Sequence, residues 1–307
     1  MTYDFDAMLA KIIEKQWSLA DIDWDAPGAE TMSDETRARM KPFMADLVWI
    51  EHIGARGFAA LAKKAPTPAI REIYRYFHAE EQKHANAELA LMRRWGMLED
   101  GRVPEPNINV KLAIKVLDTY GDQLPLTGLA ALIPMLEVAL DGALVKFLTD
   151  EVKDPVCHEV FRHINSDEAR HITTDFEVLD LIGARGPVEN LVKGVGLLDP
   201  RVLVGLIVVF VPLINKIRDN VVGMGLDERK LMNAVRRFAK IGGRGEHTRY
   251  VPTYHIFRVL AGMITDREHP YHRLLADPMV KLTGKLPARL LGKPQSWVKG
   301  LSPEAVA

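Results

Sequence analysis

The amino-acid sequence predicts an all-α protein whose centre is a four-helix bundle, with additional helices in its C-terminal part. Long segments with helical spacing of apolar residues are separated by proline and glycine breaks, and no run of alternating β-branched residues occurs. A second observation is a pattern that occurs twice, a glutamate followed about 30 residues later by Glu-x-x-His. Its members are Glu51, Glu81 and His84, then Glu137, Glu168 and His171. The repetition predicts two similar helix pairs.

Caps and prolines set the helix boundaries in the first half of the chain. A short amphipathic helix is expected over residues 4–17, followed by an irregular stretch. The first bundle helix covers 34–64, with Pro42 marking either a kink or its true start. Thr67 lies between two prolines and caps the second bundle helix, which runs to about residue 95.

The second helix pair follows a linker at 101–106 and a shorter helix at 109–120. The third bundle helix is expected over 126–152, with a kink at Pro134. Asp154 and Pro155 supply the cap and the first turn of the fourth helix, which ends near Gly183.

The chain beyond residue 187 predicts further helices and a loosely structured tail after Pro287. The expected helices lie near 199–222, 226–240, 252–265 and 269–284. We therefore predict three parts: an N-terminal helix and lead-in (1–33), the bundle (34–185) and an additional helical lobe with a tail (186–307). Three roles stay open for the lobe: it covers the bundle, binds substrate or makes a homodimer contact.

Composition limits the class of protein. The 307 residues include 40 basic and 41 acidic side chains, so the sequence gives no reason to expect nucleic-acid binding through a basic surface. The single cysteine, Cys157, excludes an intrachain disulfide and fits a reducing, cytoplasmic location. The first residues lack the layout of a secretion signal. The longest apolar run, 202–214, is shorter than the roughly 20 residues of a membrane span, so we expect a buried helix. The alternative is that this run docks on a membrane or on an apolar partner.

The repeated glutamate and histidine residues have the chemistry of metal ligands. Residues three apart lie on one face of a helix, so each Glu-x-x-His is able to close on one ion. Glu51 and Glu137 interrupt apolar stretches, and a buried carboxylate needs a cation, a proton or a partner. Four carboxylates and two imidazoles suit two divalent iron or manganese ions. We therefore predict a di-metal site made by these six residues.

Charged neighbours of the predicted ligands are expected to support or tune the site. Glu80 and Asp167 each lie four residues before a ligand histidine and are candidates to accept its other ring N–H, with Arg170 as a counter-charge. Three further acids lie one or two turns from a ligand: Glu88, Asp141 and Asp175. They are extra ligands, proton relays or solvated side chains, and the sequence leaves these alternatives open.

The order Glu, Glu-x-x-His, Glu, Glu-x-x-His, with Asp167 to His171 as its most specific piece, resembles the ferritin-like non-haem di-iron oxidases and oxygenases. These include desaturases, monooxygenases, ribonucleotide reductase small subunits and aminoarene N-oxygenases. The resemblance covers residues 34–183 and implies a ferritin-like bundle in which Glu81 and Glu168 bridge the metals, Glu51 and Glu137 are terminal ligands, and the reduced centre activates O2.

At two positions the sequence departs from the pattern of particular subfamilies, which argues against their reactions. Glu88 stands where radical-storing reductases tend to carry tyrosine, which argues against the reductase role. Ile164 stands where N-oxygenases add a third histidine, and His163 points about 80° away from His171 and is a poor substitute. The N-oxygenase reaction is thereby disfavoured without being removed.

The leading hypothesis is an O2-dependent di-iron oxidase or oxygenase that hydroxylates, desaturates or N-oxidises a small or acyl-type organic substrate. Its cofactor would be two iron ions, or a mixed manganese and iron pair. Electrons would come from an external ferredoxin or reductase, since no nicotinamide or flavin motif is present. No catalytic residue is predicted beyond the metal ligands. The alternatives are a ferritin-like iron-binding or iron-handling protein without an organic substrate, and a degenerate structural bundle.

Overall fold

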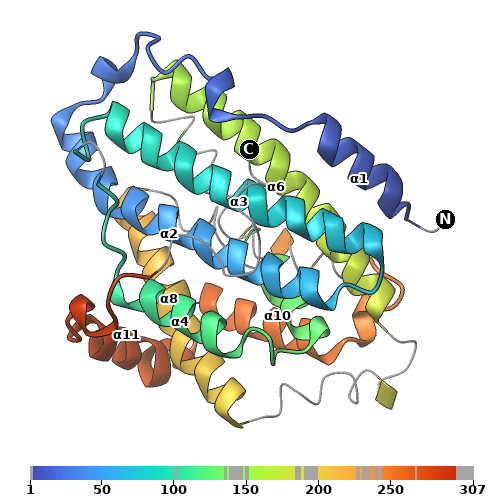
Figure 1. The fold of residues 1–307 in the computed structure, drawn as a ribbon. Helices are drawn as coiled ribbons and strands as arrows, with labels where there is room; N and C mark the ends of the chain where they lie inside the picture. The colour runs from blue at the N-terminus through green and yellow to red at the C-terminus, as the bar shows by residue number, and fades with distance from the viewer. Residues whose placement is uncertain are drawn as a thin grey trace.

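The computed structural model describes residues 3–99, 102–134, 137, 148, 152–183, 188–189, 200–225, 229, 233, 236–237, 240, 244–266 and 268–294. Regular structure within these residues is helical only, which confirms the predicted all-α class. Figure 1 shows α2, α3 and α6 packed in one layer, with α1 along their outer side and α4, α8, α10 and α11 on the other.

The first helix pair of the bundle consists of α2 (Asp34–Lys64) and α3 (Pro68–Arg94). The Ser33 hydroxyl caps α2 by accepting the Thr36 N–H at 3.2 Å, and the Thr67 hydroxyl caps α3 by accepting the Ile70 N–H at 3.3 Å. Helix α2 continues through Pro42, so this proline does not mark its start. The boundary predicted from Thr67 is confirmed.

The second pair follows α4 (Ile108–Tyr120) and consists of a segment helical over 126–134 and at residue 137, and of α6 (Pro155–Ile182). Asp154 caps α6 as predicted, with Pro155 in its first turn. The predicted third bundle helix, 126–152, is described only at 126–134, 137, 148 and 152. Residue 152 is not helical, and Asp141 lies outside the described residues.

The ends of the chain differ in detail from the prediction. Helix α1 (Phe5–Glu14) stops three residues earlier than expected, which leaves Trp17 outside the helix. The C-terminal helices are α8 (Pro200–Gly223), α10 (Pro252–Thr265) and α11 (Asp277–Gly284), and a π-helical turn at His272–Ala276 leads into α11. A 3-10 helix, Ala288–Leu291, replaces part of the expected loose tail. Most of the predicted helix 226–240 lies outside the described residues.

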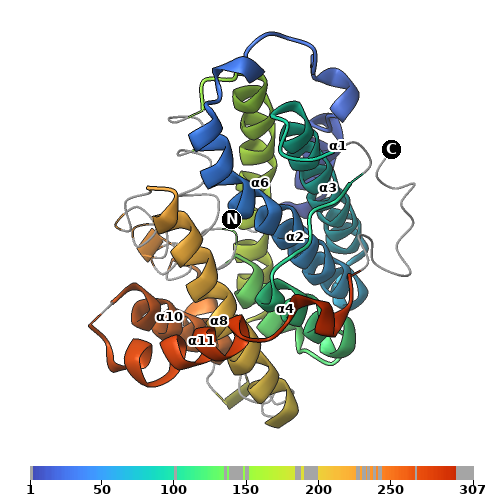
Figure 2. The ribbon, with the colours of Figure 1, turned by 90° about the vertical axis from the view of Figure 1, so that its left-hand side faces the viewer.

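Large apolar side chains between α2 and α3 form much of the core. Trp49, Phe58, Tyr74 and Phe77 are fully buried, and the rings of Phe58 and Phe77 pack edge to face at 5.3 Å between centroids. The Trp49 indole N–H is satisfied by the Pro104 carbonyl at 2.8 Å. Figure 2 shows α8 crossing below this core beside α4 and α11. None of the described helices is both long enough and apolar enough to cross a membrane.

Candidate metal centre

The structure brings all six predicted ligands together at the centre of the bundle. Glu51 comes from α2, Glu81 and His84 from α3, Glu137 from the segment after 126–134, and Glu168 and His171 from α6. Two groups of potential ligand atoms form, each with its atoms within 4.8 Å of one another. The first group is Glu51, Glu81, His84 and Glu168, and the second is Glu81, Glu137, Glu168 and His171. Glu81 and Glu168 belong to both groups, in the position of bridges.

The two histidines point one ring nitrogen each into this cluster of six, which we call the carboxylate–histidine cluster. The His84 Nδ1 atom lies 3.2 Å from Glu168 Oε1 and 3.8 Å from Glu51 Oε2. The His171 Nδ1 atom lies 3.2 Å from Glu81 Oε1 and 3.7 Å from Glu137 Oε1. Each histidine therefore faces one terminal carboxylate and at least one shared carboxylate.

Several atoms of the cluster are buried without a hydrogen-bond partner among the described residues: Glu81 Oε1, His84 Nδ1, both oxygens of Glu137, and His171 Nδ1. Buried polar atoms are normally paired, so unpaired ones indicate a missing partner. All of these atoms are potential ligands that point inward. Four carboxylates and two imidazoles are a donor set for two divalent iron or manganese ions. The residues present thus fit a di-metal group, and the cluster is able to bind two metal ions.

Burial and mutual repulsion shift the pKa values of the cluster residues. Burial raises the pKa values of Glu81 and Glu137 well above the usual range, and neighbouring carboxylates raise them further. Burial also raises the pKa of Glu168, but the two imidazoles outweigh it and hold that pKa at about 2. Burial lowers the pKa values of His84 and His171, but the surrounding carboxylates leave both well above 6.5. Positive charge is therefore favoured throughout this pocket.

The outward ring nitrogens of the two histidines are paired across the helices. His84 Nε2 donates to Asp167 Oδ2 of α6 at 3.0 Å, and His171 Nε2 donates to Glu80 Oε2 of α3 at 2.9 Å. Asp167 and Glu80 are the acceptors that the sequence suggests, but each serves the histidine of the facing helix rather than the one four residues later. Both bonds join α3 and α6, so this pairing depends on how the two helices face each other. These bonds fix the ring orientation and the tautomer.

A layer of polar groups holds the two outer carboxylates in turn. Arg170 bonds both of them, with Nη2 at 3.2 Å from Glu80 Oε1 and in close contact with Asp167 Oδ1. This is the counter-charge expected from the sequence. The lead-in after α1 adds two contacts: Trp17 Nε1 donates to Asp167 at 2.8 Å and Gln16 Nε2 donates to Glu80 at 2.6 Å. Sequence reasoning missed Gln16 and Trp17, since no local pattern relates them to residues more than 60 positions away.

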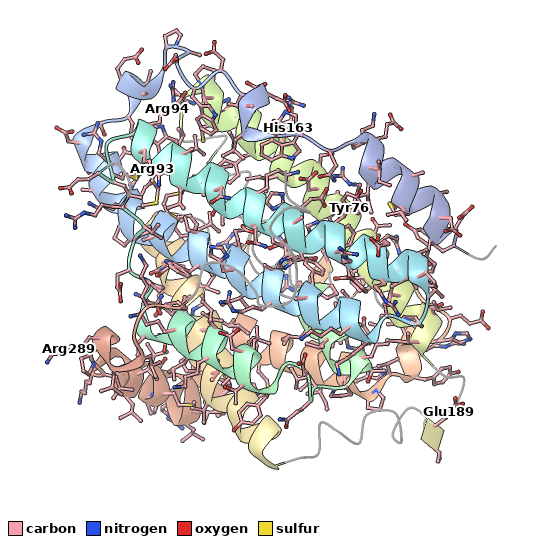
Figure 3. The ribbon with its side chains drawn as sticks, in the orientation of Figure 1. Tyr76, Arg93, Arg94, His163, Glu189 and Arg289 are labelled. Atoms are coloured by element: carbon pink, nitrogen blue, oxygen red, sulfur yellow. The ribbon has the colours of Figure 1, made fainter. Side chains whose placement is uncertain are left out.

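His163 is not part of the cluster. Its ring stacks on the Trp17 indole with 4.9 Å between centroids, on the side of α6 that faces the lead-in (Figure 3). This agrees with the expectation that His163 points away from His171. The outer layer of Trp17 and His163 covers the centre from the α1 side of the bundle.

Glu88 and Asp175 extend the acidic cluster on both sides. Both side chains are completely buried, and none of their four carboxyl oxygens has a hydrogen-bond partner among the described residues. Burial and then Glu51 raise the pKa of Glu88 well above its usual range, while burial raises that of Asp175 to about 8. Asp175 in turn raises the pKa of Glu137. Of the three alternatives left open by the sequence, solvated side chains are wrong for these two residues. Neither Glu88 nor Asp175 belongs to either of the two groups of potential ligand atoms.

An apolar cavity lies directly beside the cluster. It encloses about 850 Å³ of space free of protein atoms, part of it open to solvent. Its charged wall consists of Glu51, Glu81, Glu88, Glu137 and Glu168. The remaining lining residues are glycines and apolar side chains: Leu47, Ile50, Ile53, Gly54, Gly57, Leu117, Leu129, Leu132, Ile133, Phe161, Ile164, Phe210, Leu213 and Ile217. The last three come from α8, so the C-terminal lobe completes the cavity wall.

Two glycines of α2 give the cavity and the cluster their space. A Cβ atom at Gly54 would lie 2.3 Å from Glu81 Oε2, and one at Gly57 would lie 2.6 Å from Ile133 Cδ1. Gly54 therefore allows a bridging carboxylate to approach α2. The sequence offered one signal that could have found it, since Gly54 lies three residues after Glu51 and hence on the same helix face.

Comparison with known proteins adds a distant likeness. No protein-family model and no curated protein matches the chain. A solved structure similar to it is a variant of an R2-like ligand-binding oxidase with an anaerobically reconstituted Mn/Fe cofactor, at 15% identity and a TM-score of 0.40, over 86% of this chain and 91% of that one. Independently of that match, four helical segments that contribute one Glu, one Glu-x-x-His, one Glu and one Glu-x-x-His are the arrangement of ferritin-like di-metal carboxylate proteins. The chain resembles this superfamily in its helical fold and in its ligand set.

Proposed function

We propose that the protein is an O2-dependent di-metal oxidoreductase that oxidises a small or acyl-type apolar molecule. The observation that carries this proposal is the apolar cavity, because it opens onto the same carboxylates that form the cluster. A pocket of mostly apolar walls with a few convergent polar groups is typical of an organic-substrate site. Hydroxylation, desaturation and N-oxidation are the candidate reactions.

In this proposal the six cluster residues hold two iron ions, or one manganese and one iron. Glu51 and His84 would serve one ion, Glu137 and His171 the other, and Glu81 and Glu168 both. When bound, the metal pair supplies the redox chemistry with O2 that amino-acid side chains lack. An external ferredoxin or reductase would supply electrons.

The protein's own groups would position and protect this chemistry. Glu80 and Asp167 orient the imidazoles from outside, and Arg170 balances the charge of both acids. The apolar wall of the cavity would exclude water and place an apolar segment of the substrate against the cluster. This wall includes Leu132, Ile133 and Leu213. Binding and orientation of the substrate would thus be the tasks of the chain.

A test measures O2 consumption by reduced, iron-loaded protein with a panel of saturated fatty acids and alkylamines, and analyses the organic products by mass spectrometry. We expect at least one probe to be oxidised. Leu213→Trp should fill the cavity and suppress oxidation without changing the metal content. Leu181→Trp, at a half-exposed position on α6, is the matched control that should retain activity.

An iron-handling protein would give a different result. In that case O2 would be consumed only for the oxidation of iron, without any organic product, and equally by the parent protein and by Leu213→Trp. Such an outcome would replace the oxidoreductase proposal by the ferritin-like alternative. The apolar character of the cavity opposes that alternative, because hydrated iron needs polar groups along its route.

A further inference from the structure

The C-terminal segment 273–293 exposes an unusual number of leucines. Leu274, Leu282 and Leu290 are 70%, 64% and 65% exposed, and Leu275 and Leu286 are exposed as well. Isolated apolar side chains on a surface are common, but five within one short segment indicate an interaction site. We call this segment the leucine–lysine surface. Figure 1 shows α11 and the chain after it at the lower left edge of the molecule.

Leu282 of α11 and the leucines of the preceding π-helical turn, Leu274 and Leu275, lie on the outer face of one helical segment. At about 90° to 100° per residue, the three side chains fall within roughly 100° of one another. The opposite face holds the buried residues Ala276 and Thr283 and packs on the body of the protein. The inner face of the segment therefore packs on the protein, while its outer leucines are exposed to solvent.

Basic side chains accompany the exposed leucines. The surface carries Arg273, Lys281, Lys285, Arg289 and Lys293, all exposed, against one exposed acid, Asp277. The whole chain has a formal charge of −1, so this excess of positive charge is local. Arg289 points outward at the edge of the molecule in Figure 3. A ligand of this surface should combine negative charge with an apolar phase.

We propose that the leucine–lysine surface docks on the surface of an anionic lipid bilayer. Leucines would insert at the level of the acyl chains, while the lysine and arginine stems reach back to the head-group phosphates. Protein–protein interfaces are enriched in aromatic residues and depleted in lysine. The exposed described residues of 273–293 include three lysines and no aromatic side chain, which favours lipid over a protein partner.

The position of this surface gives the docking a consequence for the cavity. Helix α11 packs on α8 and α4, and the 3-10 helix Ala288–Leu291 packs on α4. The same two helices supply Phe210, Leu213, Ile217 and Leu117 to the cavity wall. Docking would bring that wall close to the lipid phase, so an apolar substrate would come from the membrane. This consequence, unlike the docking itself, rests on the proposed function.

The test is co-sedimentation of the full chain with vesicles of equimolar phosphatidylglycerol and phosphatidylcholine, compared with phosphatidylcholine alone. We expect binding to the anionic vesicles that weakens with salt. Leu282→Ser with Leu290→Ser should reduce the affinity on the order of tenfold or more. Lys281→Gln with Lys285→Gln should reduce it on the order of tenfold or more and lower its salt dependence. The matched control, Ile13→Ser with Leu181→Ser, alters two exposed apolar residues elsewhere and should bind normally.

Three results would overturn the docking proposal. These are no sedimentation with anionic vesicles, equal sedimentation with both kinds of vesicle, and equal losses in the leucine variant and its control. If the leucine variant instead abolishes self-association or binding of an acidic protein while vesicles are not bound, the surface serves a protein contact and the proposal also fails. Vesicle binding does not require metal, so its failure is distinguishable from failure of the proposed oxidation.

Discussion

The absence of a side chain at Gly54 controls how closely Glu81 approaches α2. A Cβ atom there would lie 2.3 Å from Glu81 Oε2, so the carboxylate must move. We predict that Gly54→Ala lowers the metal content of the protein below two ions per chain. The fold should persist, because alanine is favoured over glycine within a helix by about 1 kcal/mol. Metal analysis after reconstitution, with circular dichroism as the check on folding, measures both.

Gly57→Ala is the matched control, one turn further along α2. Its Cβ would contact the Ile133 side chain rather than a ligand. This variant should keep two metals and bind apolar ligands more weakly, because the cavity shrinks. Equal metal loss in both variants would show that helix packing, not the position of Glu81, is responsible.

A second prediction concerns Glu80, one of the two carboxylates that accept a hydrogen bond from a cluster histidine. Glu80→Gln removes the charge that His171 Nε2 bonds, and we expect metal affinity to fall about 10-fold to 100-fold. Glu72→Gln, on the same helix but half-exposed and paired with Arg75 at 3.2 Å, should have no effect. Competition with a metal chelator measures the difference. Unchanged affinity in Glu80→Gln would mean that the bond does not support the ligand.

The sequence was sufficient to predict which six side chains converge, but not their surroundings. Glu-x-x-His places two ligands on one helix face by local geometry alone, so Glu81, His84, Glu168 and His171 follow from spacing. The bonds from His84 to Asp167 and from His171 to Glu80 depend on how α3 faces α6. Trp17 reaches Asp167 across 150 positions of the chain, and no local pattern encodes such a contact. The role of Asp141 stays a prediction, because this residue lies outside the described residues.

At the scale of elements, Asp154 ties the start of α6 to the end of α3. Its side chain accepts the Val156 N–H at 3.0 Å as a helix cap, bonds Arg94 at 2.7 and 3.0 Å, and accepts the Trp95 indole N–H at 2.9 Å. The group is fully buried. We predict that Asp154→Ala lowers the free energy of unfolding by about 3 kcal/mol, because it removes the helix cap and leaves the Arg94 guanidinium with only the carbonyls of Trp24 and Ala26 among these partners, without a negative charge.

Urea unfolding followed by circular dichroism measures this change. Asp34→Ala is the matched control, since it removes the exposed Asp34–Arg37 pair and should cost less than about 1 kcal/mol. An equal, small effect of the two substitutions would contradict the role given to Asp154.

The Asp154 carboxylate should also make the stability of the protein depend on pH. Burial raises the pKa of Asp154, but Arg94, Trp95 and the backbone N–H of Val156 outweigh it and hold the pKa below its usual value. The contribution of the carboxylate is therefore complete above about pH 4, the unfolded value, and is lost as the pH falls through the lowered folded value. The stability difference between the parent protein and Asp154→Asn should narrow below about pH 4 in urea titrations. A difference independent of pH would contradict this account.

The helix boundaries show which elements can be predicted from sequence. Thr67 before Pro68 and Asp154 before Pro155 carry strong local signals, and both caps are confirmed. Pro42 permitted two interpretations, because a proline either kinks a helix or marks its start. In the structure α2 continues through Pro42, and residues on both sides of it are buried. The helix over 4–17 was predicted too long, since Gln16 and Trp17 leave the helix to bond Glu80 and Asp167.

At the scale of the whole molecule, the cavity joins the two halves of the chain. The apolar run 202–214 predicted a buried helix, and the sequence left three roles open for the C-terminal lobe. In the structure α8 packs on α4 and α2, and Phe210, Leu213 and Ile217 complete the cavity. This position supports both the covering role and the substrate-binding role of the lobe. A periodic pattern identifies the buried face of a helix but not the partner against which it packs. The boundaries at residues 33 and 185 stay a prediction.

Six side chains from four helical segments converge on one pocket, and we propose that they bind two metal ions there. The most direct measurement is anomalous diffraction at the iron absorption edge from crystals of the iron-reconstituted protein. We predict two peaks in each chain, one bound by Glu51 and His84 and one by Glu137 and His171, with Glu81 and Glu168 contacting both. A single peak, or no peak at this cluster after reconstitution, would contradict the account.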